Sequence, residues 1–430
     1  MAQKLVHRPQ PSRRAVLRQL AGAGAAATAA MLPGSSVFAQ NRSGALGPGQ
    51  GLEWSQGFDS ASRTITMPSS RFATLTATTV QSLERAIQEY TNIVQRGGWK
   101  AVPASERLRV GMSHSGVVPL RQRLIVTGDL AATSGVTDIF DSYVEAGVKR
   151  FQARNGISAD GVLRESTIAA LNVPAEVRLK QLDTNIVRVR SMSGYLGDRY
   201  AVVNIPAAHL EAVQNGEAVL RHTTIVGKPD RASPVLQAKI VEVNFHPFWT
   251  VPASIIQKDL IPKMQAEPEY LAKNKIRIYD QRGRELPANL VNWQSDEAVN
   301  YMFRQDPGEQ NSLGTIRVNM PNPQAVYMHD TPSKNLFGED FRFISSGCVR
   351  IQNIREFVVW LLKDTGGWSR ARIDGVIKSG ERAEAKLAKP IPVYWVYITA
   401  WANPDGIVQF RDDVYGHDGL GIRPVATRAG

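Results

Sequence analysis

The sequence has a single cysteine, Cys348, among its 430 residues. An intramolecular disulfide is therefore excluded, and so is a zinc site built from several cysteines. If the protein works in an oxidising compartment, a lone thiol is either a small buried hydrophobic residue or a nucleophile. The residues around Cys348 have to decide between these two interpretations.

The sequence also lacks the signatures of several other protein classes. Hydrophobic residues make up 43% and charged residues 21%, which is ordinary for a globular protein and unlike a membrane or disordered chain. We find no RNA-recognition aromatic motif, zinc-finger spacing or phosphate-binding loop, so a nucleic-acid partner is disfavoured. The net charge of +12 indicates a basic surface that suits an anionic partner or matrix. The length allows more than one domain.

Residues 1–39 contain five basic residues and no acidic residue. The adjacent Arg13 and Arg14 precede an apolar stretch rich in alanine and glycine, and small residues around Ala39 suit a cleavage site. The stretch is too short and too weakly apolar for a stable membrane span. This segment resembles a twin-arginine signal peptide, which implies the twin-arginine export machinery as a partner and a periplasmic mature protein. The alternative is an ordinary basic N-terminus ahead of a flexible tract.

Helical patterns dominate the first part of the mature chain. Apolar residues recur at helical spacing in 78–96 and again in 175–190. Two shorter patterns between them are separated by a turn-rich break at 156–161. The expected segments are a linker at 40–77, a helical scaffold at 78–104, a small all-α module at 105–173 and a connecting helix within 174–199.

The module at 105–173 also carries recognisable motifs, namely Phe151-Gln152, Asn155-Gly156-Ile157, Asp160-Gly161-Val162 and Ala170-Leu171-Asn172. In this order they resemble the peptidoglycan-binding domain family. The resemblance implies that the module binds peptidoglycan glycan. A helical packing module that no longer binds glycan fits the same residues.

From Tyr200 onward the pattern changes to short β-branched runs bounded by Gly, Pro and Asn. We therefore predict a mostly β domain at 200–366. Helix-like sequence at about 252–310 interrupts it, and an insertion of this length is usually a lid or cap. The segment 367–430 is expected to add C-terminal strands that pack on this domain. Together with the helical module, this predicts an α+β fold.

The motif with the clearest chemistry is Ser345-Ser346-Gly347-Cys348-Val349-Arg350. A thiolate, and not a thiol, attacks an acyl carbon, so a neighbouring imidazole has to take the thiol proton. His329 is the nearest histidine in the sequence and follows a predicted strand. We therefore propose Cys348 as a nucleophile and His329 as its base, although His329 alone also fits a structural histidine at a strand end.

Neighbouring residues supply candidates for further roles. The backbone N–H groups of Gly347 and Cys348 are oxyanion-hole candidates. Arg350 is a candidate to bind a substrate carboxylate, or it pairs with a structural carboxylate instead. Ser345, Ser346 and Tyr327 are further substrate-binding candidates, and the two serines also fit plain turn residues. After this motif, Asn353 and Glu356 predict a capping box at the start of a helix.

The order of His329, a spacer and then Ser345, Gly347, Cys348 and Arg350 resembles the catalytic domain of L,D-transpeptidases of the YkuD type. The resemblance runs from about residue 80 to about residue 420 and looks like the large branch of the family, which has an inserted cap. Many members have a histidine where Ser346 stands, whereas the large branch resembles this chain in having serine. Further motifs that carry the resemblance are Val226-Gly227-Lys228-Pro229, His246-Pro247-Phe248-Trp249, Arg304-Gln305-Asp306-Pro307-Gly308 and Tyr397-Ile398-Thr399-Ala400-Trp401.

The resemblance implies a reaction on peptidoglycan stem peptides. Cys348 would attack the carbonyl of the third stem residue, usually a diamino acid, expel the terminal D-Ala and keep a thioester. An amine of another stem, or a free D-amino acid, would then resolve the thioester. No metal or organic cofactor is required, and carbapenems are expected to inhibit. A hydrolase that uses water and a non-catalytic peptidoglycan-binding protein are the alternatives.

Overall fold

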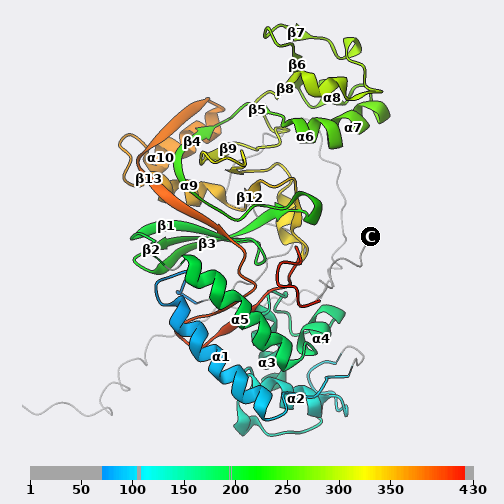
Figure 1. Ribbon diagram of the computed structural model, residues 1–430, viewed down its shortest axis with the longest axis vertical. Helices are drawn as coiled ribbons and strands as arrows, with labels where there is room; N and C mark the ends of the chain where they lie inside the picture. Colours follow the sequence, from blue (N-terminus) through cyan, green and yellow to red (C-terminus); the bar gives the residue numbers. More distant parts are fainter. Residues whose placement is uncertain (1–69, 104–107, 193, 195, 422–430) are drawn as a thin grey trace, which may run out of the picture. The chain divides into compact units, whose positions relative to one another are not determined.

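The computed structural model describes residues 70–103, 108–192, 194 and 196–421 (Figure 1). The predicted signal peptide at 1–39 and most of the predicted linker lie outside these residues. Within the described part of the chain, no helix is both long enough and apolar enough to cross a membrane. The fold is α+β, as predicted: helices come first, and a large mixed sheet follows.

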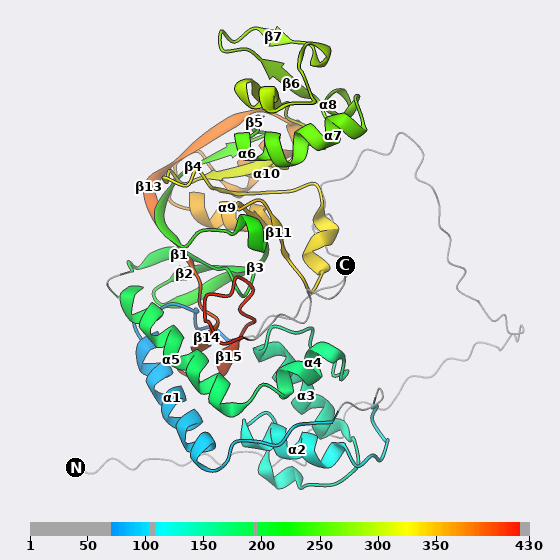
Figure 2. The ribbon, with the colours of Figure 1, turned by 45° about the vertical axis from the view of Figure 1, so that its right-hand side comes forward.

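Two long helices, α1 and α5, pack against each other and lie side by side in both views (Figures 1 and 2). Leu83 and Tyr90 of α1 and Leu182 of α5 are buried in one apolar cluster with residues of the sheet. The helical periodicity of these residues is what places them on one face. The helices of this region are α1 (Thr79–Gln95), α2 (Val117–Val126), the 3₁₀ helix η1 (Ala132–Ser134), α3 (Ser142–Arg154), α4 (Glu165–Leu171) and α5 (Ala175–Met192).

Helices α2, α3 and α4 surround a core of their own, in which Leu124 and Phe151 are buried. The Phe-Gln and Asp-Gly motifs have a structural role in this core. The buried Gln152 amide donates to the Val162 carbonyl at 2.9 Å and accepts from the Gly161 N–H at 2.8 Å. Because unpaired buried amides are costly, this pair of hydrogen bonds fixes the turn between α3 and α4.

The catalytic candidates lie on a nine-stranded sheet with the order β11-β3-β12-β10-β9-β4-β13-β1-β2. The long strand β3 pairs with β2 along its first half and with β12 near its end, so the sheet closes on itself. The strands are β1 (Arg199–Asn204), β2 (His209–Gln214), β3 (Glu217–Gly227), β4 (Leu236–Phe245), β9 (Ile316–Asn319), β10 (Met328–His329), β11 (Phe343–Ser345), β12 (Val349–Ile351) and β13 (Ala383–Val396). A separate hairpin joins β14 (Ala400–Ala402) to β15 (Val408–Phe410).

One face of the closed sheet packs on two helices, α9 (Ile354–Leu362) and α10 (Arg370–Ser379). Phe357 and Leu361 of α9 are buried there against sheet residues such as Val349. Strand β13 comes from the segment 367–430, which was expected to add C-terminal strands, and it lies between β4 and β1 in the sheet. The 3₁₀ helices η2 (Pro229–Arg231) and η6 (Lys334–Gly338) lie in the connections.

The segment expected to form a cap contains a small sheet and short helices with a separate core (Figure 1). Ile256 and Phe303 are buried in that core. The first helical run passes through a π-helical turn, a feature that often occurs at functional sites. The elements are β5 (Trp249–Thr250), α6 (Ala253–Ile255), the π-helix η3 (Ile256–Leu260), α7 (Ile261–Ala266), α8 (Tyr270–Lys273), β6 (Ile276–Tyr279), β7 (Glu285–Leu286), η4 (Ala288–Leu290), η5 (Asp296–Asn300) and β8 (Met302–Gln305).

The buried histidine His222 makes stability depend on pH. Burial lowers the pKa of His222 to about 4, although its Nδ1 lies 2.9 Å from the Gln352 carbonyl oxygen. Between pH 6.5 and pH 4 the unfolded chain therefore binds a proton at His222 that the folded protein does not bind. The free energy of unfolding consequently decreases as the pH is lowered. We expect His222 to contribute a loss of about 2 kcal/mol between pH 7 and pH 5.

Urea unfolding of His222→Gln and of the parent at both pH values measures this contribution. The loss between pH 7 and pH 5 is expected to be about 2 kcal/mol smaller in His222→Gln. The exposed His114 provides the matched variant, His114→Gln, which should behave like the parent. An identical pH dependence in all three proteins would contradict the prediction.

Candidate active site

Cys348 is half-buried in the loop between β11 and β12. The loop makes a sharp turn at Gly347, whose φ of 110° is a conformation that disfavours residues with a Cβ. The Val349 N–H that follows the thiol donates to the Tyr327 carbonyl at 3.1 Å. The nucleophile candidate is thus held at the start of an inner strand, and rigid elements of this kind suit a reactive group.

Strand register brings His329 to the same face of the sheet as Cys348. In the parallel pair of β10 and β12, Met328 lies opposite Val349 and His329 lies opposite Arg350. Side chains alternate along a strand, so Met328 and Val349 enter the core while His329, Arg350 and Cys348 point to the other face. Cys348 lies two residues before Arg350, so it is the diagonal neighbour of His329 across this pair.

The His329 imidazole has a defined tautomer. Its Nδ1 is hydrogen-bonded to the Asp330 carbonyl oxygen, which can only accept. Nδ1 therefore carries the proton, and Nε2 keeps a lone pair that can take a proton from the thiol. The Asp330 carboxylate is held in turn by the Thr315 N–H at 2.9 Å and by the Lys334 ammonium.

Burial governs the protonation states of this pair. It lowers the pKa of His329 to about 3, and the positive charges of Arg350 and Arg317 lower it further. Burial also raises the pKa of the Cys348 thiol to about 11, against the effect of the Tyr327 backbone N–H and both arginines. Thiol and imidazole are consequently both neutral at pH 7, so the proton has to move as the sulfur attacks.

Two guanidinium groups flank the imidazole. Arg317 of β9 lies opposite His329 on one side, and Arg350 of β12 lies opposite it on the other. Among the described residues, the Nε of each arginine has no hydrogen-bond partner and no carboxylate lies within ion-pair distance of either. Arg317 stacks over the Tyr327 ring at 4.5 Å. Unpaired arginines beside a candidate nucleophile suit a substrate that carries carboxylates.

The loop before Cys348 is braced from within. Ser345 is buried, and its Oγ donates to the Cys348 carbonyl at 2.6 Å and accepts from the Gly347 N–H at 3.2 Å. The Gly347 N–H is therefore used inside the loop. No acceptor in the described part of the chain binds the Cys348 N–H, which leaves that donor for an oxyanion.

We expect Ser345→Ala to lower the acylation rate of Cys348 roughly tenfold, because the loop loses hydrogen bonds of about 1 kcal/mol each. Stopped-flow measurement of acylation by imipenem gives this rate. The exposed neighbour Ser346 provides the control, and Ser346→Ala should stay within about twofold of the parent, since it loses one exposed hydrogen bond. Equal effects of the two substitutions would contradict the role of Ser345 as a brace.

Ser346 connects the loop to the cap. Arg231 of η2 donates from Nη1 to the Ser346 Oγ at 3.0 Å and from Nη2 to an Asp259 carboxylate oxygen at 3.0 Å. Asp259 belongs to the π-helical turn of the cap. The cap segment is thus tied to the loop that carries Cys348.

Two protein-family models match parts of the chain. Residues 198–376 match the YkuD family, described as "L,D-transpeptidase catalytic domain". Residues 113–171 match the family described as "Putative peptidoglycan binding domain". A "Putative L,D-transpeptidase" of Haemophilus influenzae is 36% identical over 217 residues, which are 50% of this chain and 44% of that protein. The chain therefore spans less than half the length of this curated relative.

Residues 198–376 form an L,D-transpeptidase catalytic domain of the YkuD family.

Solved structures of L,D-transpeptidases are also similar to the chain. One from Mycobacterium smegmatis is 12% identical and covers 46% of this chain and 58% of its own, with a TM-score of 0.22. Another, in complex with imipenem, is 13% identical and covers 46% of this chain and 59% of its own, with a TM-score of 0.22.

The L,D-transpeptidase domain has the groups needed for acyl transfer by a thiol. Cys348 supplies the sulfur, His329 a neutral base with its lone pair on Nε2, and the Cys348 N–H a donor for the oxyanion. The sequence pointed to these residues and to Arg350. It did not point to Arg317 or Arg231, because only strand pairing and loop packing bring them to Cys348. The one sequence signal concerns Arg317, a basic residue between the apolar residues of a predicted strand.

Proposed function

We propose that this protein is a peptidoglycan L,D-transpeptidase. Cys348 takes an acyl group from the third residue of a tetrapeptide stem, D-Ala leaves, and an amine of another stem resolves the thioester. The observation that carries the proposal is the placement of Cys348 on the same sheet face as His329. Two arginines without carboxylate partners flank this histidine. The L,D-transpeptidase catalytic domain at 198–376 supports the same chemistry.

The proposed steps follow the protonation states. His329 Nε2 takes the thiol proton as the sulfur attacks the amide carbonyl, and the Cys348 N–H stabilises the oxyanion. The imidazolium then gives its proton to the leaving nitrogen of D-Ala as the C–N bond breaks. In the second half, His329 takes a proton from the incoming amine, which attacks the thioester carbonyl. The thiolate leaves, and the same proton returns to the sulfur.

The two arginines give the site a preference for anionic stems. A stem peptide carries a carboxylate on D-Ala and, where the third residue is a diaminodicarboxylic acid, another at the end of that residue's side chain. Arg317 and Arg350 lie on either side of the imidazole, so each can hold one carboxylate while the carbonyl faces the sulfur. Guanidinium groups form paired hydrogen bonds with carboxylates, which orients the substrate as well as binding it.

Mass spectrometry of the purified protein with tetrapeptide stems tests the proposal. We expect a mass gain on the peptide that contains Cys348 and a product in which two stems are joined or a D-amino acid is exchanged. Release of the free tripeptide alone would favour the alternative hydrolase. No adduct at any concentration, with glycan still bound, would replace the proposal by a non-catalytic binding protein.

We expect Arg317→Gln to raise the KM for tetrapeptide stems about tenfold, since one charge-assisted interaction is lost. Steady-state kinetics with a stem whose carboxylates are amidated provides the internal comparison, because that stem should lose its sensitivity to the substitution. Arg355→Gln removes an arginine that is paired with Asp374 at 3.4 Å and should leave KM unchanged. A rise in KM of the same size for both stems in Arg317→Gln, relative to the parent, would contradict carboxylate binding by Arg317.

We further propose that the helical module at 113–171 binds peptidoglycan glycan. Two of its surface residues support this: Tyr143 is 66% exposed and Ile139 is 46% exposed. Exposed aromatic and aliphatic side chains suit the apolar faces of sugar rings. Co-sedimentation of the full chain with purified cell-wall sacculi, compared with Tyr143→Ala, tests this binding.

The export route is proposed from the sequence alone. Arg13 and Arg14 precede the apolar stretch in the order of a twin-arginine signal, so we propose a periplasmic protein cleaved near Ala39. Cell fractionation of the full chain against a form with both arginines changed to lysine tests it. Retention of the parent in the cytoplasm would contradict it.

A further inference from the structure

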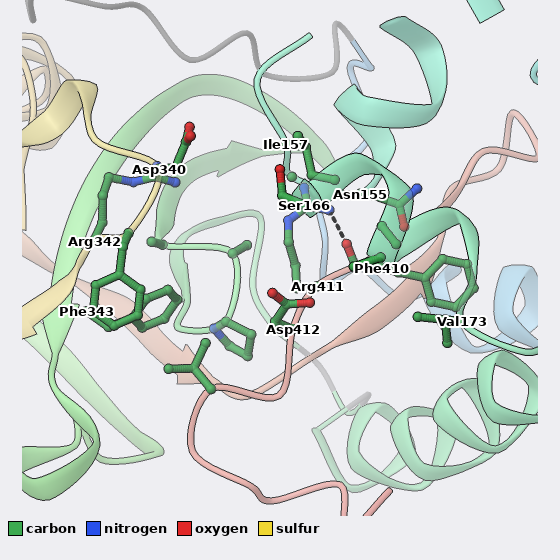
Figure 3. Close-up of a pocket in the computed structure, with 18 of the residues that line it drawn as sticks. Asn155, Ile157, Ser166, Val173, Asp340, Arg342, Phe343, Phe410, Arg411 and Asp412 are labelled. Atoms are coloured by element: carbon green, nitrogen blue, oxygen red, sulfur yellow. Dashed lines mark hydrogen bonds between the residues drawn. The ribbon is translucent and has the colours of Figure 1, made fainter. Parts of the chain in front are cut away.

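A cavity lies where the helical module meets the closed sheet, and neither Cys348 nor His329 lines it. Its volume is about 270 Å³. The walls come from the turn after α3, from α4 and α5, from the turn between β1 and β2, and from segments 340–343 and 410–414. We call it the junction pocket. Figure 3 shows Arg411 and Asp412 between the wall that carries Arg342 and Phe343 and the wall that carries Asn155 and Ser166.

Arg178 and Arg411 bring buried positive charge to the junction pocket. Arg178 donates to the Gln181 amide oxygen at 2.9 Å, and Arg411 donates to the Arg154 and Phe410 carbonyl oxygens at 2.9 and 2.7 Å. All of these acceptors are uncharged. Among the described residues, no carboxylate lies within ion-pair distance of either guanidinium. Burial lowers the pKa of Arg178 to about 10 and that of Arg411 to about 9.

Asp412 is the acidic group that faces both arginines. Its surface is open to water in the pocket, yet the surrounding protein raises its pKa, and Arg178 and Arg411 act against that rise. No described residue donates a hydrogen bond to its carboxylate. The pocket lining carries three arginines, Arg178, Arg342 and Arg411, and two aspartates, Asp340 and Asp412. Among the described residues, Arg178, Arg411 and Asp412 form no close ion pair, so a ligand with complementary charges would gain from these three groups.

The size of the pocket limits the ligand. Small side chains such as Ala169 and Ala207 leave the space open, and Phe343 and Val414 make part of the lining apolar. Pockets for drug-sized ligands measure about 300–1,000 Å³, so this cavity lies just below that range. It fits one or two amino-acid residues and is too small for a disaccharide.

We propose that the junction pocket binds the zwitterionic head of an α-amino acid. The carboxylate lies between Arg178 and Arg411, and the ammonium group lies at Asp412. Two sources share this chemistry: a free amino acid such as D-alanine, and the side-chain end of a diaminodicarboxylic acid within a stem peptide. The second source rests on the proposed function, because it assumes that the protein meets peptidoglycan stems.

Calorimetric titration of the full-length Cys348→Ala protein tests the proposal, since this background prevents turnover. The probes are D-alanine and a stem tripeptide that ends in meso-diaminopimelate, each compared with its carboxylate-amidated form. Binding of D-alanine identifies a free amino acid as a ligand, and binding of the tripeptide alone identifies the stem. Equal binding of the amidated forms would overturn the proposal.

Two substitutions in the pocket test whether the ligand binds there. They leave Arg178 and Arg411 unchanged, because Arg411 also donates to backbone carbonyls. Asp412→Asn removes the negative charge that attracts the ammonium, and Ala169→Leu fills the cavity. Each is expected to weaken binding at least about tenfold. Asp183→Asn, at an exposed position of α5 outside the pocket, changes the net charge equally and should bind like the Cys348→Ala parent. Unchanged affinity in both pocket variants would overturn the proposal.

The two proposals fail in different ways. If Cys348 is acylated normally in the wild-type protein but neither probe binds at the junction pocket, the pocket proposal fails alone. If the pocket binds D-alanine but no thioester forms on Cys348, the transpeptidase proposal fails alone.

Discussion

Replacement of Cys348 by alanine is expected to abolish thioester formation and to reduce turnover of tetrapeptide stems at least about 10⁴-fold, as for the loss of a nucleophile in other acyl-transfer sites. The reason is that every proposed step passes through this sulfur atom. No second cysteine exists in the chain to take over its role. Binding of the stem should persist, because Arg317 and Arg350 remain in place.

The fold is expected to tolerate the substitution. Cys348 is half-buried and lies in a loop that Ser345 and the pairing of β12 hold independently of the thiol. Circular dichroism and thermal unfolding check this, and the melting temperature should shift by no more than a few degrees. Intact-protein mass spectrometry with imipenem then reads acylation directly. An adduct of normal size and rate in Cys348→Ala would show that another residue is the nucleophile.

Local sequence patterns predicted the elements whose packing is local. The periodic apolar residues at 78–96 correspond to α1, and the run after Cys348 corresponds to α9. The capping box predicted for the start of α9 was wrong. Asn353 has a left-handed φ of 51° and makes no side-chain capping hydrogen bond. Glu356 instead accepts from Arg370 at 2.7 Å, so a partner from α10 replaces the predicted local contact.

Strand β13 shows why the sheet could be predicted only in part. Its first half, 383–389, consists of alanine, glutamate, lysine and leucine. Of these residues, only Ala385 and Leu387 are buried. These residues favour helices when isolated. They form a strand because β4 pairs with them, as in the pairing of Ala385 with Val243. Such pairing between distant segments overrides local propensity and leaves no local signal.

The residues of the candidate site also differ in whether the sequence could predict their roles. Cys348 and His329 could be paired from the sequence because their motif resembles a known family. Arg317 could not, since its place opposite His329 depends on the antiparallel register of β9 and β10. Ser345 was expected among substrate-binding residues, and the structure places its hydroxyl inside the loop. Only the folded backbone shows which polar groups are already used.

Replacement of His329 by glutamine is expected to change both the size of the acylation rate and its dependence on pH. In the wild-type protein the imidazole titrates with a pKa of about 3 and the thiol with a pKa of about 11. Both groups therefore stay neutral across the usual range, and His329 can take the thiol proton at any pH within it. The rate of acylation by imipenem should be nearly level between about pH 5 and pH 9.

Without the imidazole, only thiol that has already ionised can attack. Because the thiol pKa lies far above neutrality, the thiolate fraction rises about tenfold for each unit of pH up to that value. His329→Gln should therefore be about 10²–10⁴-fold slower than the wild type at pH 7, and the gap should narrow steadily as the pH rises. The sign follows from the thiol alone: raising the pH removes its proton, and only the variant depends on that removal.

Stopped-flow acylation from pH 5 to pH 10 measures both profiles, and His114→Gln is the matched control because His114 is an exposed histidine of the helical module. The control should keep the level wild-type profile. A flat profile in His329→Gln at a reduced rate would mean that another group accepts the thiol proton. A rising profile in the wild type would mean that His329 does not act as the base at all, because the attacking sulfur would then depend on bulk ionisation in both proteins.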